Sequence, residues 1–536
     1  MSNHPRRIHS HRRPHSTITR HDTAALHAAI GALLGSMVGD ALGAPFEFGP
    51  AGEYSRRFPT PVRGGRGEMV GGGGFGWAPG EFTDDSQMAV ALADSLVQAA
   101  DDDLDLDDLW RRWRAWAATA ADVGIITRMA LGHAHHVGAA EAAHASLGRS
   151  AGNGALMRST PLALFALRWG TLDDSHVIAR VVDWTLQQAA LTHHDPAAGW
   201  GAVIHVELVR RSILGADVFA DDDRVLREVL ALLPDDIRPR FATMLSADWV
   251  PGVDPSEPGN GSVWGCLAAA VWAVRHHPAF ADAVVAAIDL GGDTDTVACV
   301  AGALAGARAT IQGIPCRWTT YVHGHVPALD LDLDGDDDTR TEMLDNAALQ
   351  SLARVLVGQS AAVSQAPEWP AEPEQLAPGI WLADLAGAAE FARSIHPDEP
   401  WAVISMCLTG SAFDHLPVRR EVYMIDKPGE ANTRLLESLA DAVDTIEAWR
   451  AEGRDVLIHC HGGRSRTALV AKAWAMRALG LDADAAHVWL ADGWHRYSTH
   501  NPTFMEILAT EWSTTTGPAT SGRTGNADLT HTTEDR

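Results

Sequence analysis

The segment Leu290-Gly-Gly-Asp293-Thr294-Asp295-Thr296 places alternating carboxylates and hydroxyls immediately before a long stretch rich in alanine and valine. A second segment far earlier in the chain, Gly80-Glu-Phe-Thr83-Asp84-Asp85-Ser-Gln-Met88, has the same character. Hard divalent cations prefer oxygen ligands of this kind. If the fold brings the segments together, they can hold two cations at the separation of about 3.5–4 Å that is common in binuclear sites. The six candidate metal ligands are Thr83, Asp84, Asp85, Asp293, Asp295 and Thr296.

Each segment taken alone has a second interpretation. Thr83 and Asp84 can cap a helix, because hydroxyls and carboxylates accept hydrogen bonds from the free N–H groups of the first turn and are favoured by the helix dipole. The presence of both segments in one chain favours a metal site over two unrelated caps.

Apolar residues between positions 25 and 357 recur at helical spacing. Met88, Leu92 and Leu96 are four residues apart, and the pair Asp195-Pro196 is a typical helix start before another periodic run. Few stretches in this region alternate apolar and polar residues as strands do. The sequence therefore predicts an all-α domain over 25–357.

The composition limits the classes of function. A chain of 536 residues is too long for one hydrophobic core, so at least two domains are expected. The formal net charge of −27 disfavours nucleic acid and anionic membranes as partners. Five widely spaced cysteines are poor material for a disulfide framework and favour a reducing cytoplasm. No signal peptide is recognised, and apolar stretches such as Thr296–Ala307 are too short to span a membrane.

The remaining segments differ in composition from the helical region. Residues 1–24 are rich in His and Arg and are predicted to form a disordered basic tail. Residues 358–377 are rich in proline and predict a linker. Residues 378–512 alternate short β-branched runs with amphipathic stretches, which is typical of an α/β domain. Residues 513–536 are rich in Thr, Gly and Ser and predict a second disordered tail.

A phosphate-binding loop is predicted within the α/β region. The stretch Val456-Leu-Ile-His459-Cys460-His-Gly-Gly463-Arg464-Ser465-Arg466-Thr467 predicts a strand, a loop and a helix in succession. The backbone N–H groups of such a loop and of the helix N-terminus point at one place and create an anion site. The same field favours the thiolate form of Cys460. The Arg466 guanidinium can bind two phosphate oxygens and stabilise developing charge.

The motifs of the helical region together resemble the ADP-ribosylglycohydrolase family. The resemblance covers residues 30–320 and rests on strings that occur in the family's order. These are Gly35-Ser-Met-Val-Gly39-Asp40-Ala-Leu-Gly43-Ala-Pro-Phe-Glu47, the two acidic segments, Ser150-Ala-Gly152-Asn153-Gly154-Ala-Leu-Met-Arg158-Ser-Thr-Pro161, Leu191-Thr192-His193 and Ile314-Pro315 with Trp318. One departure is Phe82, which stands where the family frequently has Trp.

This resemblance implies an all-helical domain with a binuclear Mg²⁺ or Mn²⁺ centre that removes ADP-ribose from an acceptor, commonly an arginine or serine side chain. It implies the six oxygen donors above as the metal ligands. It also implies that Glu47 protonates the leaving group or positions the water, and that Gly152, Asn153 and Gly154 cradle the diphosphate, since such a turn exposes N–H groups to an anion. His193 would line the same cleft, although a role at the start of a helix is equally open.

The loop around Cys460 resembles the signature of the protein tyrosine and dual-specificity phosphatases. The resemblance covers 378–512 and implies phosphomonoester hydrolysis through a phosphocysteine intermediate, without a metal. The general acid belongs on an upstream loop, and Asp426 in Met424-Ile-Asp426-Lys-Pro428-Gly429 is the candidate, with an ordinary turn residue as the alternative. The resemblance further implies that His459 orients the loop and Thr467 assists thiolate departure. Gly463, Arg464 and Ser465 would bind the phosphate.

The sequence therefore predicts a bifunctional hydrolase with two divalent cations in its first catalytic domain. The expected partners are an ADP-ribosylated protein or small molecule and a phosphorylated substrate. Two alternatives stay open: one domain reads ADP-ribose or phosphate without turnover, or the first domain acts on a small non-protein substrate. The acceptor linkage, the phosphatase substrate, the choice between magnesium and manganese, the oligomeric state and the reason for the fusion are not determined by the motifs.

Overall fold

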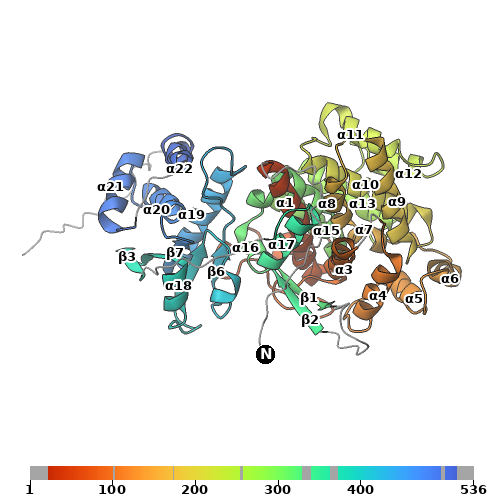
Figure 1. The fold of residues 1–536 in the computed structure, drawn as a ribbon, viewed down its shortest axis with the longest axis horizontal. Coiled ribbons are helices and arrows are strands. Elements are labelled where there is room, and N and C mark those ends of the chain that lie inside the picture. Colours follow the sequence, from red (N-terminus) through yellow and green to blue (C-terminus); the bar gives the residue numbers. More distant parts are fainter. Residues whose placement is uncertain are drawn as a thin grey trace, which may run out of the picture.

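The computed structural model describes residues 22–99, 103–172, 174–253, 258–328, 340–361, 372–496 and 501–515. A larger helical domain, formed by the described residues between 22 and 361, lies beside a smaller α/β domain, formed by those between 372 and 515 (Figure 1). Most of the predicted basic tail, the centre of the predicted linker and most of the predicted C-terminal tail lie outside the described residues.

The helical domain has twenty helical elements among its described residues. They are α1 (Thr23–Gly43), η1 (Ala44–Phe46), α2 (Glu53–Arg57), α3 (Asp84–Gln98), α4 (Leu106–Ala117), α5 (Ile125–Leu131), α6 (Ala139–Leu147), α7 (Gly154–Met157), α8 (Thr160–Phe165), η2 (Ala166–Arg168), α9 (Ser175–Ala190), α10 (Pro196–Ile213), α11 (Ala220–Leu230), α12 (Arg238–Met244), α13 (Val263–His276), α14 (Phe280–Ile288), α15 (Thr294–Ala309), η3 (Ile311–Gly313), α16 (Cys316–Thr319) and α17 (Asn346–Leu356).

Helices α1 and α15 pack against each other at backbone contact in the centre of this domain. Small residues every fourth position on α1 face small residues on α15. The facing pairs are Gly31 with Gly306, Gly35 with Gly302, Gly39 with Ala298 and Gly43 with Thr294. A Cβ added to Gly302 would lie 2.1 Å from the carbonyl oxygen of Gly35. Because all four of these α1 positions are glycine, no Cβ on α1 separates the two helix backbones, and they can approach this closely.

Helix α1 is more apolar than the sequence-based expectation allowed. Among the described residues, only the stretch Thr23–Phe46 is long and apolar enough to span a membrane by length and composition, with a mean hydropathy of 1.4. The expectation that apolar stretches are all short is therefore wrong here. In the structure 94% of the most apolar part of this stretch is buried. Its high hydropathy is therefore consistent with a helix in the core of the domain.

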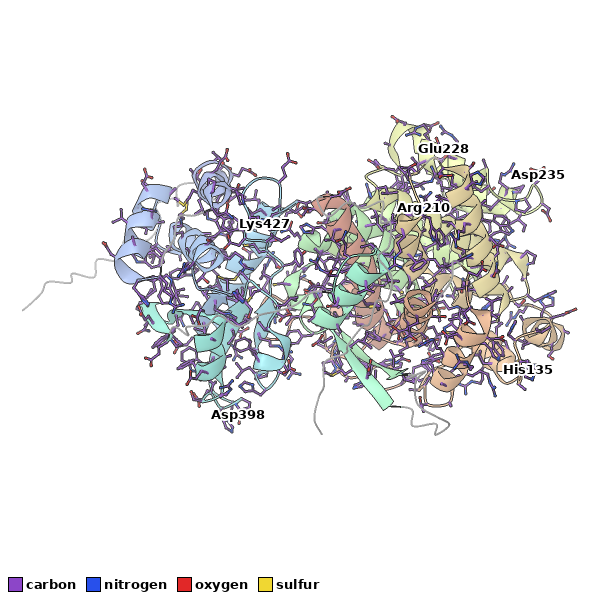
Figure 2. All side chains as sticks on the ribbon, viewed as in Figure 1. His135, Arg210, Glu228, Asp235, Asp398 and Lys427 are labelled. Carbon is purple, nitrogen blue, oxygen red and sulfur yellow. The ribbon has the colours of Figure 1, made fainter. Side chains whose placement is uncertain are left out.

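Helix α10 begins where the pair Asp195-Pro196 predicts. The Asp195 carboxylate accepts a hydrogen bond from the backbone N–H of Ala197 at 2.9 Å. Farther along the helix lies the fully buried Arg210, which is labelled in Figure 2. Its guanidinium donates to the Glu207 carboxylate at 2.8 Å, so this buried charge has its partner one turn away. Local helix-start chemistry therefore places the helix, and an ion pair within the helix neutralises its buried charge.

A two-stranded hairpin departs from the all-α prediction for 25–357. Strand β1 (His323–Ala328) pairs antiparallel with β2 (Arg340–Asp345). Gly324 and Pro327 in β1 are residues that strands disfavour, which explains why the local pattern concealed the strand. The N–H of Phe82 donates to the His323 carbonyl at 2.9 Å, so the hairpin holds the segment just before Thr83.

The α/β domain contains a five-stranded sheet in the order β3-β4-β7-β5-β6. Strand β3 is antiparallel to β4, and the other neighbours are parallel. The strands are β3 (Glu374–Ala377), β4 (Ile380–Asp384), β5 (Trp401–Ser405), β6 (Arg419–Glu421) and β7 (Asp455–Cys460). The helical elements are α18 (Leu385–Ala392), η4 (Gly410–Phe413), α19 (Leu435–Ala451), α20 (Ser465–Ala478), α21 (Ala483–Gly493), α22 (Pro502–Ile507), η5 (Leu508–Trp512) and α23 (Ser513–Thr515).

Both faces of this sheet are covered. Val456 and Ile458 of β7 share a hydrophobic cluster with α19 and α20, whereas Leu457 shares another with α18 and η4. Because β7 is the central strand and is parallel to its neighbours, its carboxyl end is a favoured place for a ligand site.

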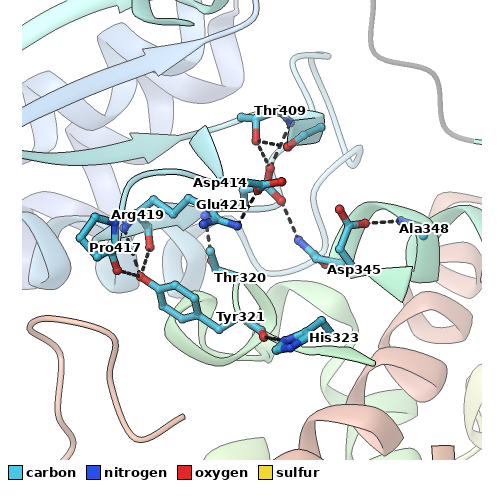
Figure 3. Close-up of polar contacts among 12 residues, drawn as sticks. Thr320, Tyr321, His323, Asp345, Ala348, Thr409, Asp414, Pro417, Arg419 and Glu421 are labelled. Carbon is cyan, nitrogen blue, oxygen red and sulfur yellow. Dashed lines mark hydrogen bonds and ion pairs between the residues drawn. The ribbon is translucent and has the colours of Figure 1, made fainter. Parts of the chain in front are cut away.

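The two domains meet in a polar contact near β6. The Tyr321 hydroxyl accepts from the N–H of Arg419 at 3.1 Å and lies 3.0 Å from the Arg419 carbonyl (Figure 3). The N–H of Glu421 donates to the Thr320 hydroxyl at 2.9 Å. The Asn346 amide donates to the Glu421 carboxylate at 2.9 Å. Residues of the helical domain thus help to hold the edge strand of the α/β domain.

Replacement of Gly302 by valine is expected to lower the free energy of unfolding by about 1–3 kcal/mol or more, because overpacking would force α1 and α15 apart. The matched control is Gly74→Ala, since a Cβ at Gly74 would meet nothing within 4 Å. Chemical denaturation of both variants measures the difference. Equal stability of the two variants would contradict the role given to the close helix contact.

Two candidate catalytic sites

The two acidic segments converge at the N-termini of α3 and α15. Thr83 precedes α3, and its hydroxyl lies 3.4 Å from Oδ2 of Asp295. The hydroxyl of Thr296 donates to Oδ1 of Asp85 at 3.2 Å. These four side chains are all buried. The structure therefore brings together the two segments that the sequence predicts to be the halves of one metal site.

Asp40 of α1 also belongs to this cluster, although its sequence context predicted no role for it. Its carboxylate is fully buried and accepts from the N–H of Thr83 at 3.0 Å and from the N–H and hydroxyl of Ser86. Carboxylate oxygens of Asp40, Asp85 and Asp295 lie within 4.8 Å of one another. The only signal in the sequence was its place between Gly39 and Gly43, the glycines that let α1 approach α15.

Glu47 also reaches this acidic cluster. It follows η1, is half-buried, and has an oxygen within 4.8 Å of those of Asp293 and Asp295. The N–H of Phe48 donates to the Gly292 carbonyl at 2.6 Å, which holds the loop after η1 against the loop before α15. The structure therefore places Glu47 beside the candidate metal ligands.

The electrostatics of the cluster fit divalent cations. Burial and then repulsion from neighbouring carboxylates hold the pKa values of Asp84, Asp85 and Asp295 well above their usual range. Burial, with repulsion from Asp122 and Asp293, raises the pKa of Glu47 to about 8. Within the described structure, Oδ2 of Asp85 is buried without a hydrogen-bond partner. Hard cations would compensate this concentration of buried oxygens, so the residues present fit Mg²⁺ or Mn²⁺.

The Gly152-Asn153-Gly154 turn lies at the edge of the cluster. The Asn153 amide donates to Oδ2 of Asp293 at 2.8 Å, so it orients a candidate metal ligand. His193 packs against the two glycines, since a Cβ on Gly154 would lie 3.0 Å from its ring. Burial and the nearby Arg158 lower the pKa of His193 to about 3, so its ring is neutral. The turn that is predicted to bind the diphosphate therefore also contacts Asp293.

Two further residues of this site, Asn260 and Asp122, had no signal in the sequence. The Asn260 side chain accepts from the N–H of Asp293 at 3.2 Å and donates to the Gly291 carbonyl at 2.8 Å. Asp122 acts on Glu47 through its charge. Both come from segments without a recognisable pattern, and only the fold brings them to the acidic cluster.

The second site lies at the carboxyl end of β7, around Cys460. A cavity of 360 Å³ is lined by Asp426, Pro428, Cys460, His461, Gly462, Arg464, Ser465, Arg466 and Asn501. Gly463 has φ of +65°, and a Cβ there would lie 2.9 Å from the Ala383 carbonyl, so the tight loop requires glycine at this position. Helix α20 begins at Ser465 and directs its N-terminus at the loop. The structure brings Cys460, Arg466 and Asp426 to one pocket.

The side chains around the loop are held in defined ways. Nη1 of Arg466 donates to the Met406 carbonyl at 2.6 Å, while its Nε is buried without a partner in the described structure. His459 lies 2.6 Å from the Ser405 hydroxyl through Nε2, and burial lowers its pKa to about 3. The Asn501 amide donates to the Asp426 carboxylate at 3.1 Å, a contact that the sequence did not indicate. The hydrogen bond to Met406 therefore orients the Arg466 guanidinium before an anion binds in the loop.

Comparison with known proteins gives matches for both parts of the chain. The family model of the ADP-ribosylglycohydrolases matches residues 21–360, and that of the dual specificity phosphatase catalytic domain matches residues 407–511. ADP-ribosylarginine hydrolase Tri1 of Pseudomonas putida (strain GB-1) is 32% identical over 305 residues, which is 56% of this chain and 75% of that protein. ADP-ribosyl-(dinitrogen reductase) glycohydrolase of Rhodospirillum rubrum is 31% identical over 295 residues, or 54% of this chain and 88% of that protein. Dual specificity protein phosphatase 12 of Mus musculus is 35% identical over 124 residues, or 21% of this chain and 33% of that protein.

Cation affinity is expected to rise as the pH increases between about 6 and about 8, the values to which the pKa of Asp40 and of Glu47 are raised. At lower pH these carboxyls are protonated, and a cation must displace the protons in order to bind. Isothermal titration calorimetry with Mn²⁺ in two buffers of different ionisation enthalpy measures the proton release. Binding that is independent of pH and releases no protons would contradict the assignment.

The raised pKa of Glu47 also determines how the stability of the metal-free protein changes with pH. Folding raises the pKa of the Glu47 carboxyl from 4.5 to about 8. Between these two pH values the folded state therefore binds more protons than the unfolded state. Stability without metal therefore falls as the pH rises through this window. Added Mg²⁺ should restore most stability at the alkaline end, and Asp293→Asn should weaken that effect.

Proposed function

Because the chain belongs to the ADP-ribosylglycohydrolase family and continues into a dual specificity phosphatase catalytic domain, we propose that it is a bifunctional hydrolase with two separate catalytic centres. The helical domain removes ADP-ribose from a modified acceptor with the help of two divalent cations. The observation that supports this most directly is the convergence of buried carboxylates from three distant segments, α1, α3 and the start of α15, on one place.

In the first centre the six predicted oxygen donors would hold the cations, and the cations would supply positive charge that stabilises the transition state. Thr83, Asp84 and Asp85 come from the α3 segment, and Asp293, Asp295 and Thr296 come from the α15 segment. Asp40 positions the first segment through its hydrogen bonds to Thr83 and Ser86.

The remaining polar residues of this centre orient the reacting groups. Asn153 fixes the Asp293 carboxylate, and Glu47 stands at the edge of the cluster with a carboxyl that can hold a proton near neutral pH. Such a group suits proton transfer to the leaving atom or from the water at the C1″ carbon. The neutral His193 ring forms an uncharged wall beside the Gly152–Gly154 turn.

We favour an N-glycosidic bond to arginine as the substrate linkage. The relative from Pseudomonas putida is named for hydrolysis of ADP-ribosylarginine. A serine linkage, a small non-protein substrate and binding without turnover are the competing possibilities.

In the second centre the Cys460 thiolate attacks the phosphorus of a phosphomonoester. The bond from phosphorus to the leaving oxygen breaks, and Asp426 donates its proton to that oxygen. Water then attacks the phosphocysteine, Asp426 takes a proton from it, and inorganic phosphate leaves with the thiolate restored. Arg466 and the loop N–H groups bind the phosphoryl oxygens, and the neutral His459 ties the end of β7 to Ser405. Thr467 stabilises the departing thiolate.

The purified full chain is expected to release ADP-ribose from an arginine-ADP-ribosylated protein only when Mg²⁺ or Mn²⁺ is present. Asp293→Ala should lower the rate by about 10²–10³-fold, the loss typical of removing one group that supports charge stabilisation in the transition state, whereas Cys460→Ser should leave the rate unchanged. A serine-modified protein tested in parallel identifies the linkage. Cation binding without release from either protein would favour a reader or a small-molecule substrate.

Hydrolysis of phenyl phosphate is expected to be abolished by Cys460→Ser and reduced about 10²–10⁴-fold by Asp426→Asn, the usual contribution of a general acid. Asp293→Ala should retain this activity. Rapid-quench trapping of a phosphorylated protein in the Asp426→Asn variant, absent from the Cys460→Ser variant, tests the intermediate. Phosphate transfer that survives the loss of Cys460 would refute the mechanism.

A further inference from the structure

Gln312 belongs to the helical domain, but its side chain forms hydrogen bonds with residues of the α/β domain. It lies in η3, directly after α15, and is 4% exposed. Its Nε2 donates to Oδ1 of Asn432 at 2.9 Å. Its Oε1 accepts from the Thr433 hydroxyl and from the N–H of Arg434, both at 3.1 Å. The side chain is therefore a fixed link from one catalytic domain into the other.

The partner Asn432 holds the loop that carries Asp426. Oδ1 of Asn432 accepts from the N–H of Ile425, and its Nδ2 donates to the Ile425 carbonyl, both at 2.8 Å. Oδ1 thus receives two donors, one from Ile425 and one from Gln312, which fixes the orientation of the amide. Because Ile425 immediately precedes Asp426, the backbone next to the proposed general acid is clamped on both its N–H and its carbonyl.

The chain between α15 and Gln312 is itself held in an unusual conformation. Thr310 has φ of +57° and ψ of 171°, a region that a β-branched residue rarely adopts. Its hydroxyl lies 3.0 Å from that of Thr433 in the α/β domain. Conformations of this kind persist only where the surrounding structure imposes them, and they are common at functional contacts. This turn directs Gln312 toward the acid loop.

We infer that Gln312 is a positioning residue for the phosphatase reaction, through which the helical domain holds the Asp426 loop in its working geometry. The inference rests on the proposed role of Asp426 as the general acid. The physical basis is that proton transfer needs the acid within hydrogen-bond distance of the leaving oxygen, so a small displacement of the loop is costly. The phosphatase centre is therefore complete only when the helical domain is docked against it.

The test compares Gln312→Ala with the unchanged full-length chain on two substrates. Phenyl phosphate has a poor leaving group and depends on the general acid, whereas p-nitrophenyl phosphate has a good one. We expect kcat to fall about tenfold for phenyl phosphate and less than about twofold for p-nitrophenyl phosphate. In an Asp426→Asn background, Gln312→Ala should cause no further loss, because the acid on which it acts is already gone.

Arg63→Ala is the matched control. It removes another contact between the domains, the ion pair of Arg63 with Asp444 at 2.7 Å on α19, without touching the acid loop. This variant should keep the ratio of the two phosphatase rates. Release of ADP-ribose by each variant shows that the helical domain is folded.

The outcomes distinguish failure of the positioning role of Gln312 from failure of the general-acid role of Asp426. Equal losses on both substrates, or no loss on either, would overturn the positioning role of Gln312 while the effect of Asp426→Asn remained. A further loss from Gln312→Ala in the Asp426→Asn background would overturn it as well. If Asp426→Asn itself left the leaving-group dependence unchanged, the assignment of the acid and the inference built on it would fall together.

Discussion

The backbone contact between α1 and α15 is the constraint on which both catalytic centres depend. Glycines at every fourth position of α1 let the two helices touch, and the Thr294 hydroxyl donates to the Gly43 carbonyl at 2.8 Å at one end of the contact. That end sets Asp40 beside the start of α15 and beside α3. The opposite end of α15 leads through Thr310 to Gln312 and the phosphatase loop. One helix pair therefore fixes the relative positions of the groups at both ends.

The acidic cluster shows how a fold accommodates an arrangement that is unfavourable by itself. Buried like charges repel and lose hydration, so their pKa values rise. Helix N-termini, the Asn153 amide and the N–H groups that Asp40 accepts from offset part of this cost. Divalent cations would offset the remainder, so cation binding would be coupled to the stability of the site.

The domain contact differs from a flexible tether because it involves oriented side chains that are buried or half-buried. Gln312, Tyr321 and Asn346 of the helical domain each make specific hydrogen bonds to the α/β domain. Two of these contacts support β6 at the edge of the sheet, and the third reaches the segment that precedes α19. Fusion in one chain keeps these groups at high effective concentration, so the contact needs little intrinsic affinity.

The sequence by itself determined the features that depend on residues next to one another in the chain. The family, the order of the two catalytic domains and the α/β class of the second are confirmed, and the strand, loop and helix around Cys460 follow directly from neighbouring positions. Helix starts such as Asp195-Pro196 are local for the same reason. Asp40, Asn260 and the Gln312 clamp have no local signature, because their partners lie on distant segments, and the β1–β2 hairpin was concealed by residues that strands disfavour. Only tertiary packing, above all the glycine contact between α1 and α15, decides which of these distant groups meet.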